Sequence, residues 1–154
     1  MDNPLCADLL HNFQKTISML KNTIKAFNAE QWLRGVSFFE VPAKVAFHTV
    51  DCLDYYFLEN QEAYKWGYRF GGGWWELKDD ELPSQPDLVK YLEEIEAKII
   101  QLLVNMQDHE LSQPHDTENT RLGYYIYALR HTIHHQGALN LMAVYHEVGE
   151  QEWE

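Results

Sequence analysis

Apolar residues recur along the chain at spacings of three and four, the period of an amphipathic α-helix. The first stretch shows this most clearly, with one stripe formed by Leu9, Phe13, Ile17, Leu20 and Ile24. Four stretches carry the period, and the helices they predict run from about Pro4 to Phe27, Pro42 to Trp66, Pro86 to Gln107 and Thr120 to Val148. No stretch alternates as a strand does. The pattern therefore predicts an all-α fold, a four-helix bundle that forms a single domain over residues 1–154.

The connection between the second and third predicted helices is long and irregular. It runs from Gly67 to Gln85 and contains a glycine triplet followed by Trp74 and Trp75. Loops of this length without secondary structure are uncommon in compact domains and are often functional. The two tryptophans either fold over a pocket or plug one end of the bundle, and the sequence favours neither reading.

The charge balance narrows the range of partners. The chain has 12 basic and 24 acidic residues, a formal net charge of -12. Cationic side chains are what bind nucleic-acid phosphates and anionic lipid surfaces, so we expect neither nucleic acid nor membrane as a partner. There are only two cysteines, no signal sequence at the start and no apolar run of the roughly 20 residues that span a bilayer. These features predict a cytoplasmic protein.

A pair of histidines, His131 and His135, stands in the last predicted helix. Residues four apart on a helix differ by about 40° in direction and about 6 Å in height, so both rings point the same way. They belong to a mostly apolar or aromatic seam, which should face the core: Tyr124, Ala128, His131, His135, Ala138, Met142 and Tyr145. The spacing lets both imidazoles reach one ion at the usual Zn–N distance of about 2.0–2.1 Å.

A third histidine, His48, lies on the apolar stripe of the second predicted helix with Val45, Cys52 and Tyr55. A buried imidazole without partners leaves its nitrogens unsatisfied, at about 1–3 kcal/mol each. Core histidines more often satisfy themselves by hydrogen bonding, and that alternative stays open. Three of them on core seams favour a metal ion, which binds the neutral ring.

Three histidine ligands leave one position of a tetrahedral ion open, as in catalytic rather than structural zinc sites. Cys52, one turn after His48, is the main candidate for a fourth ligand, with ordinary core packing as the alternative. Three neutral imidazoles suit zinc, nickel, cobalt, copper or iron(II), and the spacing does not choose among them.

The outer ring nitrogens of metal-binding histidines need hydrogen-bond partners, and Asp51, Asp54 and Gln136 are near enough in sequence to supply them. His134 is turned by about 60° from the first histidine of the pair, so we expect it at the rim of the site or on the surface. Trp74 and Trp75 are the candidates for the pocket wall. No residue is assigned a catalytic role, and the pair lacks the glutamate of the zinc-protease motif HExxH.

The order of one histidine in the second helix and an HxxxH pair in the last resembles the DinB/YfiT-like family of metal-dependent bundle proteins (not the DNA polymerase that shares the DinB name). His48 matches the first position and His131 with His135 match the pair. Gln136-Gly137 follows as in the family, but alanine then replaces its usual glutamine. The resemblance implies an up-down-down-up bundle, often a homodimer. It also implies a nickel or zinc ion, with iron, cobalt and manganese as alternatives.

Two classes of function follow as hypotheses. In the first, the open site serves a metal-dependent enzyme acting on a small molecule. The resemblance implies a thiol S-transferase that uses a low-molecular-weight thiol, and a metal-dependent hydrolase is the enzymatic alternative. In the second, the protein is a non-catalytic, stress-related binding or interaction protein of the same fold.

Overall fold

The computed structural model describes residues 3–149 and 151–154, and within them it is helical with no strand. The five α-helices are α1 (Pro4–Ala26), α2 (Ala29–Trp32), α3 (Pro42–Tyr56), α4 (Gln85–Asn105) and α5 (Arg121–Tyr145). Three short 3-10 helices join them: η1 (Phe38–Glu40), η2 (Asp79–Glu81) and η3 (Asp108–Ser112). No helix in the described part of the chain is long and apolar enough to cross a membrane.

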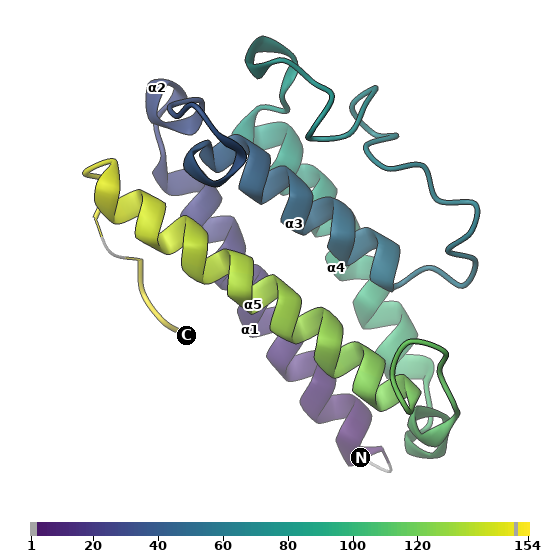
Figure 1. The fold of residues 1–154 in the computed structure, drawn as a ribbon. Coiled ribbons are helices and arrows are strands. Elements are labelled where there is room, and N and C mark those ends of the chain that lie inside the picture. Colours follow the sequence, from purple (N-terminus) through teal and green to yellow (C-terminus); the bar gives the residue numbers. More distant parts are fainter. Residues whose placement is uncertain (1–2, 150) are drawn as a thin grey trace.

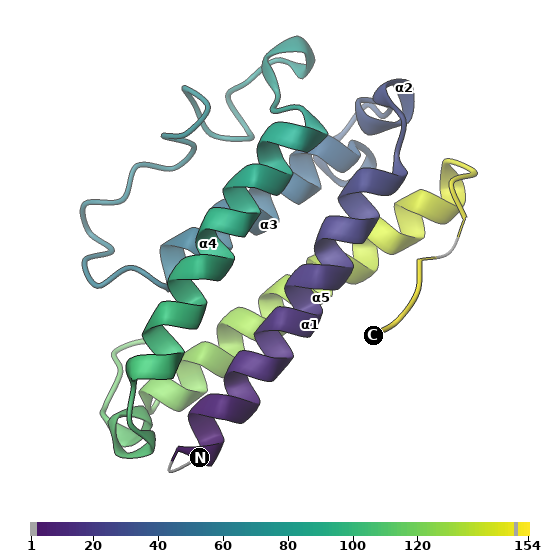
Figure 2. The same ribbon diagram turned by 180° about the vertical axis from the view of Figure 1, so that it is seen from behind.

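The four long helices pack side by side (Figures 1 and 2). Helix α1 packs against α4 and α5, and α3 packs against the same two helices. At one end, the backbone N–H of Leu5 donates to Asp108 after α4, at 3.0 Å. At the other end, the Gln31 side chain in α2 donates to the His146 carbonyl after α5, at 2.7 Å. These contacts make a helical bundle, as the sequence predicts.

The predicted stripe of α1 lies in the core. Phe13, Ile17, Leu20 and Ile24 have no exposed surface, and Leu9 is buried at one end. Full burial of such a side chain stabilises the fold by about 1.5–3 kcal/mol relative to leaving it exposed. The N-cap Ser84 of α4 accepts from the backbone N–H of Asp87, as expected for serine before a helix.

The second predicted helix is too long, because α3 ends at Tyr56 rather than near Trp66. The N–H of Phe57 already bonds to the carbonyls of Asp54 and Tyr55, which tightens the last turn. Trp66 then folds back onto Tyr55, with ring centroids 4.9 Å apart, instead of continuing the helix. Aromatic residues at helical spacing made the irregular chain look periodic.

The predicted seam of α5 is partly wrong. Tyr124, Ala128, His135 and Met142 are buried, but Tyr145 is 78 % exposed. Leu139 marks the centre of the buried face, and Tyr145 points about 120° away from it at 3.6 residues per turn. Because α5 packs against both α1 and α3, its buried face is broad, and the histidines lie on the side that faces α3.

The long connection, residues 57–84, runs back along the outside of α3 (Figure 1). Apart from η2 it has no helix. It returns the chain to the end of the bundle where α3 began, so α4 starts at that end. There the indole N–H of Trp32 donates to the Pro83 carbonyl at 3.0 Å.

Candidate metal centre

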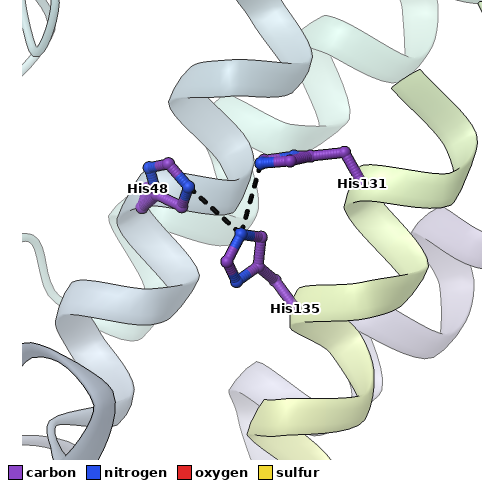
Figure 3. A group of neighbouring side chains, drawn as sticks. All are labelled: His48, His131 and His135. Atoms are coloured by element: carbon purple, nitrogen blue, oxygen red, sulfur yellow. Dashed lines mark hydrogen bonds between the residues drawn. The ribbon is translucent and has the colours of Figure 1, made fainter. Parts of the chain in front are cut away.

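Three histidine rings converge between α3 and α5 (Figure 3). His135 Nε2 lies 3.2 Å from His48 Nε2 and 3.2 Å from His131 Nε2. The ligand atoms of the three rings all lie within 4.8 Å of one another, and in the described residues they form the only such group that could hold a metal ion. His135 is 7 % exposed, and the other two rings are half-buried.

The local fold explains why these rings meet. His131 and His135 are one turn apart on α5, and His48 lies on the facing side of α3. Ala128, one turn before the pair along the predicted seam, is fully buried and small enough to leave the site uncrowded. The contact between α3 and α5 is the information that helical periodicity alone does not contain.

The spacing of the nitrogens fits a single ion. At a Zn–N distance of about 2.0–2.1 Å and a tetrahedral angle, two ligand nitrogens lie about 3.3 Å apart. The two separations from His135 Nε2, both 3.2 Å, match this value. All three rings lie within the 4.8 Å group, so the three residues could bind one divalent metal ion.

Hydrogen bonds among the three rings would satisfy their nitrogens less completely than a shared metal ion would. A neutral imidazole nitrogen carries either one proton or one lone pair. His135 Nε2 has two ring nitrogens at hydrogen-bonding distance, so it cannot make a full hydrogen bond to both. A cation shared by the three rings would use all three lone pairs at once.

Burial keeps the rings neutral. It lowers the pKa of His135 to about 3, helped by the nearby His48, His131 and His134. Burial and then His131 lower the pKa of His48 to about 4, and burial also lowers the pKa of His131. At neutral pH each ring therefore has the lone pair that a metal ion requires.

The residues predicted to support the outer ring nitrogens have other contacts. Asp51 accepts hydrogen bonds from Tyr64 and Gly67, in the connection 57–84. Gln136 donates from Nε2 to Thr23 of α1 at 2.8 Å, away from the rings.

Asp54, the other carboxylate proposed for this role, accepts from Tyr91 at 2.7 Å and from Lys98 at 2.8 Å. The buried Nδ1 atoms of His131 and His135 have no hydrogen-bond partner among the described residues. The two aspartates point to the side of α3 that faces α4 and the connection, which helical spacing from His48 did not reveal.

Cys52 is close to one histidine only. Its Sγ lies 3.6 Å from His48 Nδ1 and 3.8 Å from His48 Nε2, and it is not part of the group within 4.8 Å. Burial, with the nearby Asp51, raises the pKa of this thiol to about 12, so it stays protonated. His134 is exposed on α5, with its ring centroid 5.0 Å from that of His135. An exposed ring this close to His135 fits both positions expected for His134, the rim of the site and the surface.

Aromatic rings surround the histidines. Trp74 from the connection 57–84 contacts His48, with centroids 4.8 Å apart, and Trp75 packs on Trp74 while remaining 53 % exposed. Trp74 therefore lies against one side of the histidine site, and the reading that the pair folds over a pocket stays a prediction.

Tyr56 and Tyr127 approach His131 from the other side, at centroid distances of 5.5 Å and 6.3 Å. Sequence analysis missed both tyrosines. Their spacing could have found them, because Tyr56 is two turns after His48 and Tyr127 one turn before His131.

A cavity of about 630 Å³ opens where α3 ends and α5 begins. Tyr56, Gln61, His115, Arg121 and Tyr124 are among its lining residues. Tyr56 thus borders both the cavity and His131. This volume is within the usual range of about 300–1,000 Å³ for small-molecule sites.

Comparisons with protein-family models, with curated proteins and with solved structures found no match. The resemblance to the DinB/YfiT-like family therefore stays a prediction from the histidine pattern.

Proposed function

We propose that the protein is a metal-dependent enzyme whose ion is held by His48, His131 and His135. The observation that supports this most is the convergence of three histidine rings, with His135 Nε2 at the spacing of metal ligands from the other two Nε2 atoms. No fourth protein ligand joins the group in the described residues, so a bound ion would keep a position for a small molecule. Zinc or nickel is the ion we propose, since three neutral imidazoles suit either.

The ion would supply Lewis acidity, which lowers the pKa of a thiol or water at its open position. Within this proposal the three histidines hold and orient the ion, and Trp74, Tyr56 and Tyr127 exclude water around it. None of the three histidines is among the lining residues of the cavity beside Tyr56, so a substrate bound there would reach the ion past this tyrosine. Thiol S-transfer with a low-molecular-weight thiol is the reaction class we favour, on the resemblance of the histidine pattern.

The same resemblance leads us to propose an up-down-down-up bundle of the DinB-like class. The return of residues 57–84 along α3 supports this topology. A second copy of the chain is the protein partner we propose. Exposed apolar side chains on the last turns of α5 support it: Leu141, Val144 and Tyr145. Size-exclusion chromatography with light scattering tests this, and a monomeric mass at all concentrations would contradict it.

A spectroscopic titration tests the enzymatic proposal. Cobalt(II)-loaded protein is titrated with 2-mercaptoethanol, and a sulfur-to-cobalt charge-transfer band is expected as the thiol binds at the open position. The variant His131→Ala should show neither the cobalt spectrum nor the band. His134→Ala, an exposed histidine on the same helix, is the matched control and should behave as the original protein.

The alternative function is a non-catalytic binding protein with a closed site or hydrogen-bonded histidines. A cobalt spectrum that no thiol or small anion perturbs would favour it over the enzyme. A metal-dependent hydrolase remains the second enzymatic candidate. It would show thiol-independent turnover of an activated ester that His131→Ala abolishes and His134→Ala retains.

A further inference from the structure

The connection 57–84 is tied to α3 at separate points along that helix. Near the end of α3, Asp51 accepts hydrogen bonds from the connection. One turn earlier, Phe47 packs against Phe70, with centroids 5.2 Å apart and rings nearly perpendicular. In the first turn, Lys44 pairs with Asp79 at 3.0 Å. The connection therefore lies against α3 over most of the length of the helix.

The tether at Asp51 is buried. Its side chain has no exposed surface, and its two carboxylate oxygens accept from the Tyr64 hydroxyl at 2.5 Å and the Gly67 N–H at 2.9 Å. Hydrogen bonds to an ionised acceptor are about twice as strong as those between neutral groups. Loss of the carboxylate would also leave the buried N–H of Gly67 unpaired, which is costly. This makes Asp51 a stronger anchor than the ion pair of Lys44, where Asp79 is more than half exposed.

A tight loop connects Gly67, which bonds to Asp51, with Trp74. The Gly67 carbonyl accepts from the N–H groups of Phe70 and Gly72, at 3.0 Å and 3.3 Å. Gly67 has a positive φ of 71°, and a Cβ there would lie 2.0 Å from the Gly72 carbonyl oxygen. Residues 67–72 therefore form a closed turn with no room for a side chain at Gly67, and Trp74 follows two residues later.

Trp74 is the residue of this connection that reaches the histidines. Its ring stands edge-on to His48 at 4.8 Å and 76°. Outside it, Trp75 packs at 5.1 Å and faces solvent. Opening of the connection would withdraw both tryptophan rings and uncover the side of His48 that Trp74 contacts, because both tryptophans belong to the connection.

We propose that Asp51 is a positioning residue that holds the connection closed over the histidine site, and that it thereby controls access to His48 through Trp74. The role as an access control for metal or substrate rests on the proposed function. The tether itself does not, since it is a property of the protein without metal. In this proposal Asp51 acts through the connection, because the partners of its carboxylate are Tyr64 and Gly67.

Two variants that each remove one buried hydroxyl test the tether. Tyr64→Phe removes the hydroxyl that bonds Asp51. Thr23→Val is the control, because the Thr23 hydroxyl accepts from Gln136 and donates to the Met19 carbonyl, away from the connection. Metal-free full-length protein is treated with diethylpyrocarbonate, and carbethoxylation of each histidine is followed by peptide mass spectrometry. The exposed His134 provides an internal reference rate in every sample.

We expect Tyr64→Phe and Asp51→Asn to raise the His48 rate, relative to His134, by about tenfold, equivalent to about 1.4 kcal/mol in the opening equilibrium. Thr23→Val should leave that ratio unchanged. Trp74→Ala removes the cover directly and should raise the ratio even if the tether variants fold poorly. An unchanged ratio in Trp74→Ala or in well-folded Tyr64→Phe overturns the proposal, as does an equal rise in Thr23→Val.

Zinc release to a chelator, measured on the same variants, separates this inference from the proposed function. Faster release in Tyr64→Phe than in Thr23→Val is expected if the connection also guards bound metal, and equal release rates overturn the proposed control of metal access. Failure of the original protein to bind zinc would remove the proposed function, while the carbethoxylation result would still decide the tether.

Discussion

His135 should make the metal-free protein sensitive to mild acid. Its pKa falls from 6.5 to about 3 on folding, because burial and neighbouring histidines disfavour the imidazolium. Between these two values the unfolded chain binds a proton that the folded chain does not. Stability contributed by the neutral ring is therefore present above pH 6.5 and is lost as the pH falls below it.

The magnitude follows from the linkage relation. One pKa unit corresponds to about 1.36 kcal/mol. At pH 5, which is 1.5 units below the pKa of the unfolded chain, the free energy of unfolding is therefore lower by about 2 kcal/mol. The loss continues down to about pH 3, where the folded ring begins to bind the proton too. His48 adds to the same trend, because its pKa falls to about 4.

The substitution His135→Leu isolates this effect. Leucine fills the buried position without a titrating group, and it removes the Nδ1 atom, which has no hydrogen-bond partner in the described part of the chain. Urea denaturation of both chelator-treated proteins, at pH 7.5 and pH 5.0, gives four unfolding free energies. The original protein should lose about 2 kcal/mol more than the variant between the two pH values.

One outcome of the comparison between the original protein and His135→Leu would refute this reasoning. Equal losses in the two proteins would mean that His135 titrates normally when folded, and the buried neutral site would be wrong. At pH 7.5 the variant should be at least as stable as the original, because an unsatisfied buried polar atom costs about 1–3 kcal/mol. A variant less stable by several kcal/mol would show that the ring is well satisfied without a metal.

Three further predictions concern packing and the ligand set. Phe13→Ala, at a position with no exposed surface, should lower the free energy of unfolding by about 3–5 kcal/mol, whereas Val36→Ser, at a position 96 % exposed, should change it by less than about 0.5 kcal/mol in urea titrations. Gly67→Ala should lower the thermal midpoint, since its Cβ would collide with the Gly72 carbonyl, and an unchanged midpoint in calorimetry would contradict the closed turn. Cys52→Ala should leave the number of metal ions bound per chain unchanged, as measured by native mass spectrometry. Loss of the metal from this variant would show that the Cys52 thiol is a ligand.

Helical periodicity was sufficient to locate the helices whose apolar stripe faces the core of the bundle. It located α1, α4 and α5 close to their observed bounds. It failed after Tyr56, where aromatic residues at helical spacing pack back onto α3 from an irregular chain. Periodicity records which residues are apolar, and it does not distinguish a helix from a folded-back connection that buries the same rings.

The three histidines could be predicted, but their surroundings could not. One-turn spacing brings His131 and His135 together by local geometry alone. The approach of His48, the course of the connection that brings Trp74, and the contacts of Asp51 all depend on how α3 packs against other elements. Residues three apart on a helix, such as His48 and Asp51, are close in sequence, yet their side chains contact different neighbouring elements.

The metal content of protein purified without a histidine tag is the most direct test of a three-histidine metal centre. Elemental analysis should find about one equivalent of a divalent transition metal per chain, retained in His134→Ala and lost in His131→Ala. The absence of metal after incubation with zinc and nickel, or full occupancy in His131→Ala, would contradict the centre formed by His48, His131 and His135.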